Sequence, residues 1–406
     1  MAVTHVVNGL VFDGTGADLR DGLVVTFEDS RIVEVGVQRP SRDDVVLDAE
    51  GRTVLPGLIN AHTHLGGVDI GAGDEPPAGE VAAWIFEHCR RVLDLGFTTC
   101  RETGALDGGV VSAIEKGIAQ GPRLQVCGPI LVQMGGHADF RPAYVPDPCA
   151  HHQGVPGLAI VTSICDGEDA VRAAARLAFK RGASFLKMCA TGGVTSSSDA
   201  LSDTQFTIGE MRAAVEEAEA RHTYVTIHTH NKAGIMRGLE AGVTCFEHAT
   251  GLDDEAALAV KAAGAAIVPT LTVAHVYSTY AHFLDDAVLS RVEGVETGMR
   301  NAIKVGHEHG LLVGAGADLI GPDQKEYGLE TALVAEVVGA EQALLTATRD
   351  NARVLRLDKE LGTLEPGKIA DLILVNGNPL DDPRLLADPA NIASVIKGGT
   401  VCKDIR

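Results

Sequence analysis

The most constraining feature of the sequence is a long alternation of short apolar segments with helix-period segments in the middle of the chain. Eight apolar segments predict strands, near residues 54–59, 98–102, 123–127, 184–188, 223–228, 243–248, 266–270 and 311–317. Helical patterns separate most of them, at 81–95, 168–181, 208–222, 232–241, 253–263 and in a long segment that ends near 309. Several helical patterns close with glycine, as helix C-termini prefer (Gly96, Gly182, Gly242, Gly264 and Gly310). Eight strands with crossover helices predict an α/β fold, a (β/α)8 TIM barrel.

The two ends of the chain have a different pattern. Residues 1 to about 53 contain short strand-like segments separated by Asn-Gly and Asp-Gly turns, and residues 371–401 look similar. Neither end is long enough to bury a good core alone, so we expect them to pair. The predicted organisation is a small β-sandwich from residues 1–55 and 362–406, with the barrel at 56–361.

Composition narrows the possible partners and location. The formal net charge of −21 argues against a nucleic-acid partner or an anionic membrane surface. The sequence contains no segment typical of a signal peptide or a membrane span, so we expect a cytoplasmic protein without a membrane partner. The eight cysteines form no Cys-x-x-Cys pair, which indicates free thiols. Barrels of this kind commonly form homo-oligomers, and we expect one here.

Polar side chains stand at the C-terminal ends of the predicted strands, where the chemistry of such a barrel takes place. Residues i and i+2 of a strand share a face, so closely spaced histidines can present two imidazoles to one volume. Singly, each residue has an ordinary explanation, such as a core histidine, a lysine reaching solvent or a helix cap. Together they predict a metal site, because unpaired buried charge is costly. The set is His62, His64, Lys187, His228, His230, His248 and Asp318.

This set resembles the amidohydrolase superfamily, and the resemblance extends over nearly the whole chain. Residues 96–102 resemble the segment of the second strand in that superfamily, and residues 361–372 resemble the segment that leads back from the barrel to the β-sandwich. The resemblance implies two divalent metal ions, which we expect to be Zn²⁺. His62, His64 and Asp318 would hold the more buried metal, and His228 and His248 the more exposed one.

The resemblance also implies a role for Lys187 and a mechanism. Lys187 would bridge both metals as an N6-carboxylated lysine, together with a shared hydroxide. Asp318 would act as the general base and then pass the proton to the leaving group. Strand geometry alone does not decide whether His228 or His230 is the ligand, and the family pattern favours His228.

Within the superfamily, residues 187–194, residues 135–139 and the pair His228 and His230 look most like the prolidase-like group. That resemblance assigns His137, Tyr224 and His230 to the α-carboxylate of a substrate, although Tyr224 could equally be a core tyrosine. The segment 195–203 departs from the usual pattern and leaves the substrate open. Residues 131–160 and 270–284 are predicted to be loops, and they carry aromatic and histidine residues that could form a lid over the pocket.

We therefore expect a metal-dependent hydrolase that cleaves the amide bond of dipeptides or N-acyl amino acids next to a free C-terminal carboxylate. The alternatives are hydrolysis of a cyclic amide, as in imidazolonepropionase-like enzymes, or of a xenobiotic amide, carbamate, urea or ochratoxin-like substrate. A non-catalytic scaffold on the same fold is a remote alternative, because every expected ligand is present.

Overall fold

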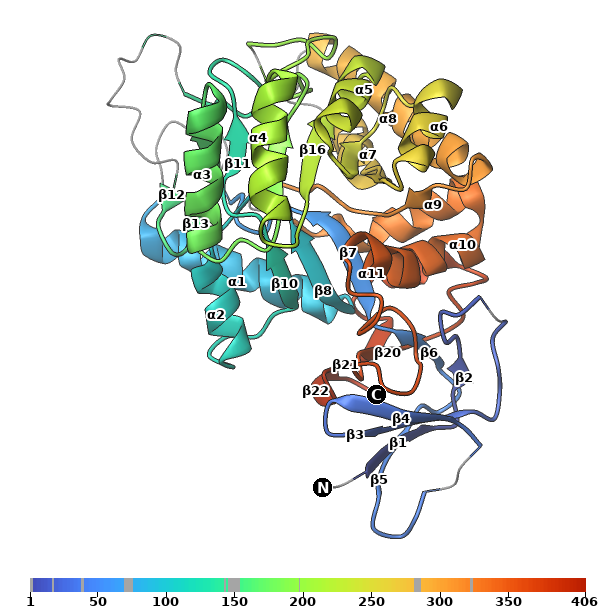
Figure 1. The fold of residues 1–406 in the computed structure, drawn as a ribbon. Coiled ribbons are helices and arrows are strands. Elements are labelled where there is room, and N and C mark those ends of the chain that lie inside the picture. The colour runs from blue at the N-terminus through green and yellow to red at the C-terminus, as the bar shows by residue number, and fades with distance from the viewer. Residues whose placement is uncertain are drawn as a thin grey trace.

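The computed structural model describes residues 3–16, 18–37, 40–68, 76–141, 144, 154–196, 198–280, 286–321 and 324–406. A larger α/β part contains parallel strands surrounded by helices, and a smaller part of β-strands lies below it in Figure 1. The smaller part contains strands from both ends of the chain. No helix in the described ranges combines the length and the apolar character that crossing a membrane requires.

The smaller part consists of two sheets. The first has the order β4 (Arg31–Gly36), β3 (Val24–Glu28), β1 (Val3–Val7) and β5 (Val45–Asp48). The second has the order β2 (Leu10–Val11), β6 (Thr53–Pro56), β20 (Leu372–Val375), β21 (Ile392–Lys397) and β22 (Thr400–Asp404). Strand β20 runs antiparallel to β6, with Ile373 opposite Leu55, so this sheet joins residues from the two ends.

Strand β20 also connects two apolar cores. Successive side chains of a strand point to opposite faces. Leu372 and Leu374 accordingly pack with Val6, Val25 and other residues of the terminal sheets. Ile373 and Val375 belong instead to a core of the larger part. The terminal strands are therefore attached to the larger part through continuous apolar packing.

The larger part contains parallel strands in two sheets. One has the order β10 (Arg123–Val126), β8 (Phe97–Glu102) and β7 (Leu58–Thr63). The other has the order β14 (Thr162–Ile164), β11 (Ile130–Val132), β15 (Leu186–Cys189), β16 (Val225–Thr229), β17 (Cys245–His248), β18 (Ala266–Val268) and β19 (Leu312–Val313). Backbone hydrogen bonds link the two sheets at both edges, from Ser184 N to Val126 O and from Ala61 N to Ala315 O.

The structure places a strand in each of the eight predicted regions, with two differences in detail. The predicted strand at 54–59 is divided, because β6 belongs to the terminal sheet and β7 to the parallel strands. Gly57 lies at the break, where an added Cβ would stand 2.2 Å from Thr98 Oγ1. The predicted strand at 311–317 is regular only over β19, and its continuation turns toward β7. Strands β11 and β14 were not predicted.

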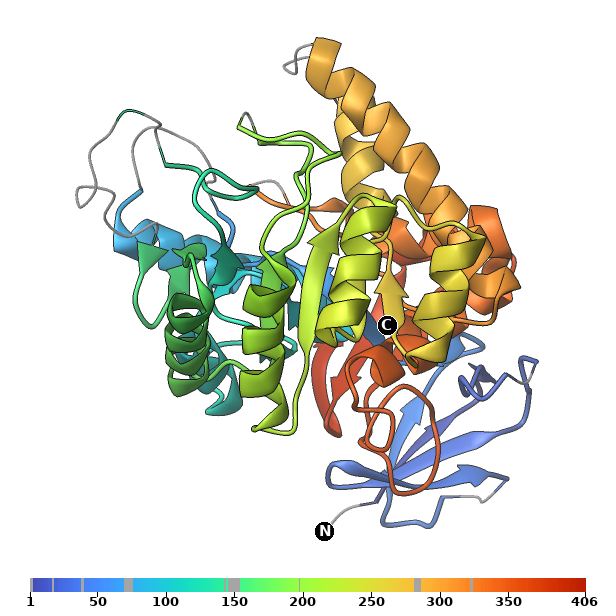
Figure 2. The same cartoon turned by 45° about the horizontal axis from the view of Figure 1, so that its top comes forward.

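The helices surround the parallel strands, most of them on the outer faces (Figures 1 and 2). They are α1 (Ala78–Asp94), α2 (Gly108–Glu115), α3 (Glu168–Lys180), α4 (Ile208–Glu219), α5 (Lys232–Ala241), α6 (Asp254–Ala262), α7 (Leu271–Tyr280), α8 (Asp286–Glu308), α9 (Leu329–Val338), α10 (Ala340–Leu345) and α11 (Asn351–Val354). The glycines predicted to end helices have positive φ angles between 63° and 101°, which confirms that role (Gly96, Gly182, Gly242, Gly264 and Gly310).

The segment 270–284 was predicted as a loop, and this is wrong over most of its length. Residues 271–280 form α7, which packs against α8 beside the open end of the parallel strands. The segment is rich in Thr, Val, His and Tyr, which are weak helix formers, so local propensity did not reveal the helix. Its first turn is held by the buried carboxylate of Glu330, which accepts hydrogen bonds from Leu271 N and Thr272 N.

Candidate metal centre

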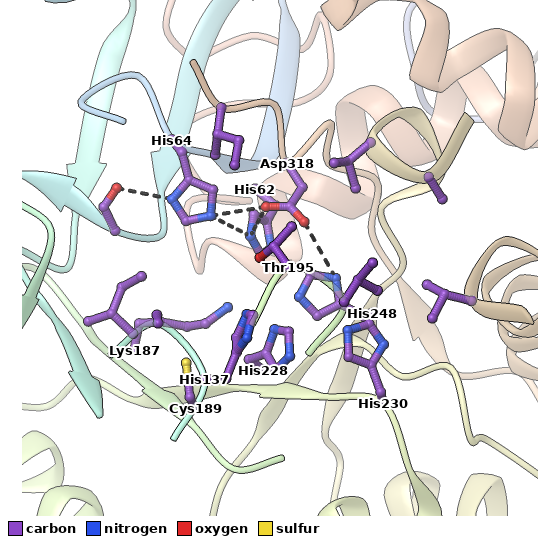
Figure 3. A pocket seen from close by; sticks show the side chains of 18 of the residues that line it. His62, His64, His137, Lys187, Cys189, Thr195, His228, His230, His248 and Asp318 are labelled. Atoms are coloured by element: carbon purple, nitrogen blue, oxygen red, sulfur yellow. Dashed lines mark hydrogen bonds and ion pairs between the residues drawn. The ribbon is translucent and has the colours of Figure 1, made fainter. Parts of the chain in front are cut away.

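The polar residues predicted from the strand ends share one pocket. Strands β7, β15, β16 and β17 and the segment after β19 supply them, all at the same end of the parallel strands. The space free of protein atoms in the pocket and at its mouth is about 880 Å³, part of which is open solvent. Figure 3 shows the polar side chains pointing toward one another. Those that line the pocket are His62, His64, His137, Lys187, His228, His230, His248 and Asp318.

His62, His64 and Asp318 form the first cluster. The two Nε2 atoms lie 3.3 Å apart, and Asp318 Oδ1 is 3.1 Å from that of His62 and 3.0 Å from that of His64. Each ring is held on its other side through Nδ1. The Nδ1 atom of His62 donates to Glu247 Oε2 at 2.6 Å. The Nδ1 atom of His64 donates to the carbonyl oxygen of Gly104 at 3.0 Å.

These hydrogen bonds determine what the first cluster can bind. Both Nδ1 atoms face oxygen acceptors, so a neutral ring keeps its proton there and leaves a lone pair on Nε2. Two lone pairs and a carboxylate oxygen then face one another and repel. A cation between them removes the repulsion, and two imidazoles with a carboxylate are typical zinc ligands. The donor set of His62, His64 and Asp318 therefore fits a divalent metal.

His228, His230 and His248 form the second cluster. Their ring centroids lie 4.5 to 4.9 Å apart, and one ligand atom of each lies within 4.8 Å of the others. Burial lowers the pKa of all three imidazoles, that of His230 to about 3. Neutral imidazole is the form that binds metals. Because the structure brings both His228 and His230 to His248, the choice between them as ligand stays open.

The two clusters are adjacent. His248 Nδ1 lies 3.8 Å from Asp318 Oδ2, and the rings of His62 and His248 are 5.2 Å apart. His248 and Asp318 both adopt the left-handed backbone region, with φ of 65° and 55°. That conformation has a free-energy cost for non-glycine residues, and such backbone strain is concentrated at functional sites. Burial alone would raise the pKa of Asp318, but His62 and its other imidazole neighbours hold it well below the usual range.

Lys187 is the unusual member of the site. Its side chain is 2% exposed, and its amine points toward the imidazoles in Figure 3. Within the described part of the chain, Lys187 has no hydrogen bond or ion pair. A buried amine without a direct hydrogen-bond or ion-pair partner is costly, so Lys187 is better suited to a chemical role than to a structural one.

His137 lies beside the second cluster. Its ring stacks on His228 with centroids 4.2 Å apart, and its backbone N–H donates to Gln205 Oε1. The ring atom Nδ1 is buried and has no hydrogen-bond partner among the described residues. Gly193 packs directly on this ring, since an added Cβ would lie 2.2 Å from His137 Cε1. His137 is thus held in place and still offers one free nitrogen.

The structure does not support the substrate contact predicted for Tyr224. Tyr224 precedes β16, at the opposite end of the strand from His228, and it does not line the pocket. Its ring stacks on Phe185 in a buried cluster, and its hydroxyl lies 3.4 Å from Arg101 Nη1. Tyr224 is a core tyrosine, which is the other reading that the sequence allowed.

Sequence reasoning missed the ion pair beneath the site. Arg101 on β8 and Glu247 on β17 are both 0% exposed, and Arg101 Nη2 lies 2.6 Å from Glu247 Oε1. The other oxygen of Glu247 accepts the hydrogen bond from His62. The sequence signal for this ion pair was a charged residue, Arg101 or Glu247, inside each of two predicted barrel strands. Nothing in the sequence showed that the two residues meet.

The expected lid is only partly described. Phe140 and Tyr277 line the pocket, whereas Tyr144 is 99% exposed. His275 lies on α7 outside the pocket lining. The other aromatic and histidine residues of the two segments have side chains that fall outside the described residues (His151, His152, Tyr280, His282 and Phe283).

Comparison with known proteins agrees with this geometry. Ochratoxinase from Aspergillus niger is 28% identical over 99% of this chain and 87% of its own length. A structure of a prolidase complexed with N-methylphosphonate-L-proline is 32% identical, with a TM-score of 0.93, over 99% of this chain and 100% of the other. A Xaa-Pro dipeptidase with bound methionine in the active site is 28% identical, with a TM-score of 0.87, over 99% and 100%.

The amidohydrolase family matches residues 53–402, which covers the parallel strands, the pocket and strands β6, β20 and β21 of the terminal sheets. The donor set described above agrees with a family that generally uses divalent metals. The chain therefore belongs to the amidohydrolase family, resembles its prolidase-like members, and is a hydrolase that acts on amide bonds.

Proposed function

We propose that this protein is a binuclear metal-dependent hydrolase that cleaves an amide bond next to a free C-terminal carboxylate. The observation that carries the proposal is the meeting of two imidazole clusters beside a buried, unpaired lysine. The parallel strands would close into a (β/α)8 barrel at residues 56–361, with a β-sandwich from 1–55 and 362–406. The hydrogen bonds between Ala61 and Ala315 and between Ser184 and Val126 support that closure.

The proposed ligands follow from the two clusters. His62, His64 and Asp318 would hold one metal, and His228 and His248 would hold the other. Lys187, carboxylated on its amine, would supply one anionic oxygen to each, which a neutral or cationic amine cannot do. When bound, two such metals, expected to be Zn²⁺, lower the pKa of a water molecule and polarise the scissile carbonyl.

Asp318 is the proposed general base. Its pKa lies well below the usual range, so its carboxylate is ionised at neutral pH and can accept the proton of the attacking water. Its second oxygen lies toward His248, within the same pocket that would receive the amide. The same carboxyl group would then pass the proton to the leaving nitrogen.

His137 and His230 are the proposed contacts of the substrate carboxylate. Both line the pocket beside His228, and His137 has an unpartnered ring nitrogen. The Nδ1 atom of His230 is 2.8 Å from Thr250 Oγ1, which fixes the orientation of the ring and turns Nε2 away from Thr250. An N–H on each ring can donate to a carboxylate oxygen.

A second candidate, hydrolysis of an ochratoxin-like amide, is favoured by one observation. The relative from Aspergillus niger matches 99% of this chain, and the pocket is flanked by apolar side chains such as Phe140 and Met299. This candidate uses the same metal ligands and differs only in the group that the pocket accepts.

The proposal is tested by elemental analysis combined with matched substrates. We expect about two metal ions per chain, loss of activity with a chelator and recovery on adding zinc. N-acyl amino acids and dipeptides should be cleaved as free acids, while their C-terminal amides should be poor substrates. One metal or none, or equal rates for acids and amides, would contradict the proposal.

A further inference from the structure

The pocket has two apolar walls that belong to different parts of the fold. One wall follows β11, where Ile130 and Ala138 pack with Phe140 in one apolar cluster near His137. The other, here called the α7–α8 wall, comes from the two helices between β18 and β19. It consists of Val273, Ala274, Tyr277, Val292, Val295 and Met299. The clusters of metal-binding side chains occupy the space between these walls.

The α7–α8 wall is firmly held. Ala274, Val295 and Met299 pack with residues of α9 in one apolar cluster. Arg300 on α8 connects to α9, with its Nη1 atom 3.1 Å from Glu336 Oε2. The carboxylate of Glu330 on α9 fixes the first turn of α7, as described above. The wall therefore presents a defined apolar surface to whatever enters the pocket.

The chemistry of this wall discriminates between two substrate classes that the proposed function allows. A dipeptide carries an ammonium group on the carbon next to the scissile carbonyl, whereas an N-acyl amino acid with an apolar acyl group carries no charge there. An ammonium placed against valine and methionine side chains loses hydration and gains no partner from the wall. The nearby carboxylate of Asp318 is already engaged with His62 and His64 and, in the proposed function, with a metal. Burial raises the pKa of Tyr277, so its hydroxyl stays neutral and offers no counter-charge.

We propose that the α7–α8 wall receives the acyl half of the substrate and selects N-acyl amino acids with uncharged, apolar acyl groups over dipeptides with a free amino terminus. This inference rests on the proposed function, in which His137 and His230 hold the carboxylate of the leaving amino acid. The side chain of that amino acid then faces the wall that follows β11, and the acyl chain extends toward α7 and α8.

The first test uses a pair of substrates that differ only in the ammonium group. L-Leucyl-L-phenylalanine and 4-methylpentanoyl-L-phenylalanine have the same shape and the same leaving amino acid. We expect the zinc-loaded enzyme to favour the second by about tenfold or more in kcat/KM, since one uncompensated charge costs at least ~1.4 kcal/mol. Equal rates, or faster cleavage of the dipeptide, would overturn the inference and leave the proposed function intact. Cleavage of neither, with cleavage of their C-terminal amides, would overturn both.

The second test places a carboxylate on the wall. Val273 is partly exposed to the pocket, so Val273→Asp would provide a partner for the ammonium, and Val273→Asn is the uncharged control of the same size. Val276→Asp is the positional control, because Val276 lies on the same helix and packs on a different core. We expect only Val273→Asp to shift the ratio of kcat/KM toward the dipeptide, by about fivefold or more.

The outcomes of the second test are distinct. The same ratio in Val273→Asp and Val273→Asn would show that the ammonium does not reach this wall and would overturn the inference. A similar shift in Val276→Asp would attribute the effect to the overall charge of α7 and would also overturn it. Circular dichroism and zinc content, measured on all three variants, verify that each is folded and loaded.

Discussion

Two buried cations in neighbouring parts of the same set of strands differ in one respect. Arg101 is 0% exposed and pairs with Glu247, which is equally buried. Lys187 is 2% exposed and makes no hydrogen bond or ion pair with any described residue. Because the desolvation cost applies to both, the protein compensates one charge within the fold and leaves the other to be compensated by something that binds or modifies it.

Arg101 supports the proposed metal ligand His62 indirectly. Arg101 also donates from Nε to the carbonyl oxygen of Ala61, one residue before His62. Glu247, the ion-pair partner of Arg101, accepts the hydrogen bond from His62 Nδ1. Burial would raise the pKa of Glu247, but Arg101 and His62 hold it well below its usual range, so it stays ionised. A charge with a complete set of partners can thus position a ligand, whereas a charge without them is a candidate for reaction.

Lys187→Ala should have the largest effect on activity and a small effect on the fold. Without the proposed carboxylated amine, kcat/KM should fall by about a thousandfold or more, and metal content should fall with it. The melting temperature of the metal-free protein should change little, because no partner is lost. Partial rescue by short carboxylic acids would support the carboxylated form, and unchanged metal content and rate would refute the assignment.

Arg101→Met should show the opposite pattern. Removing one partner of a buried ion pair leaves Glu247 uncompensated, so the free energy of unfolding of the metal-free protein should fall by about 3–5 kcal/mol. Chemical denaturation measures this directly, with Lys187→Met as the matched control. Equal destabilisation of the two variants would remove the distinction between paired and unpaired cations.

Glu247→Gln should test the ion pair separately, because it keeps the shape of the side chain and removes its charge. The amide holds the Nδ1 proton of His62 less strongly, so zinc affinity should fall by about 10- to 100-fold. Competition with a chelating dye measures the affinity without reference to turnover. The same substitution at Glu326, which is outside the site, is the control. An unchanged affinity in Glu247→Gln would show that the ion pair is only structural.

Gly193→Ala should have the smallest effect and should act on substrate binding. The added methyl group would displace the ring of His137, on which Gly193 packs. We expect KM for free-acid substrates to rise by about three- to tenfold with little change in kcat or metal content. A fall in kcat at constant KM would contradict the proposed carboxylate contact of His137.

The polar residues at the strand ends could be predicted from the sequence because strand geometry determines which of them lie together. Spacing of two residues places His62 and His64 on one face, and the direction of the strands collects them with His248 and Asp318. The same rule excludes Tyr224, which starts its strand and therefore lies at the far end. The assignment of Tyr224 rested on resemblance rather than on strand direction.

Other features could not be read from the sequence because they depend on contacts between distant residues. Arg101 and Glu247 are separated by 146 positions, and neither residue alone reveals its partner. Helix α7 consists of weak helix formers and depends on Glu330, which lies 58 positions after Thr272. In both cases tertiary contacts, rather than local propensity, determine the structure.

The position of the α7–α8 wall has a consequence for how enzymes with this fold diverge. The metal-binding side chains come from strands and from the segments directly after them. The wall comes instead from the helices α7 and α8, which connect β18 to β19. Mutations in that pair can change the shape and charge of the acyl subsite without moving a ligand. New substrates can therefore be acquired through changes in these two helices while the inherited reaction centre is preserved. Residues 271–308 are then a natural region to exchange between relatives, because Thr270, which lies 2.8 Å from His248 Nδ1, stays in place.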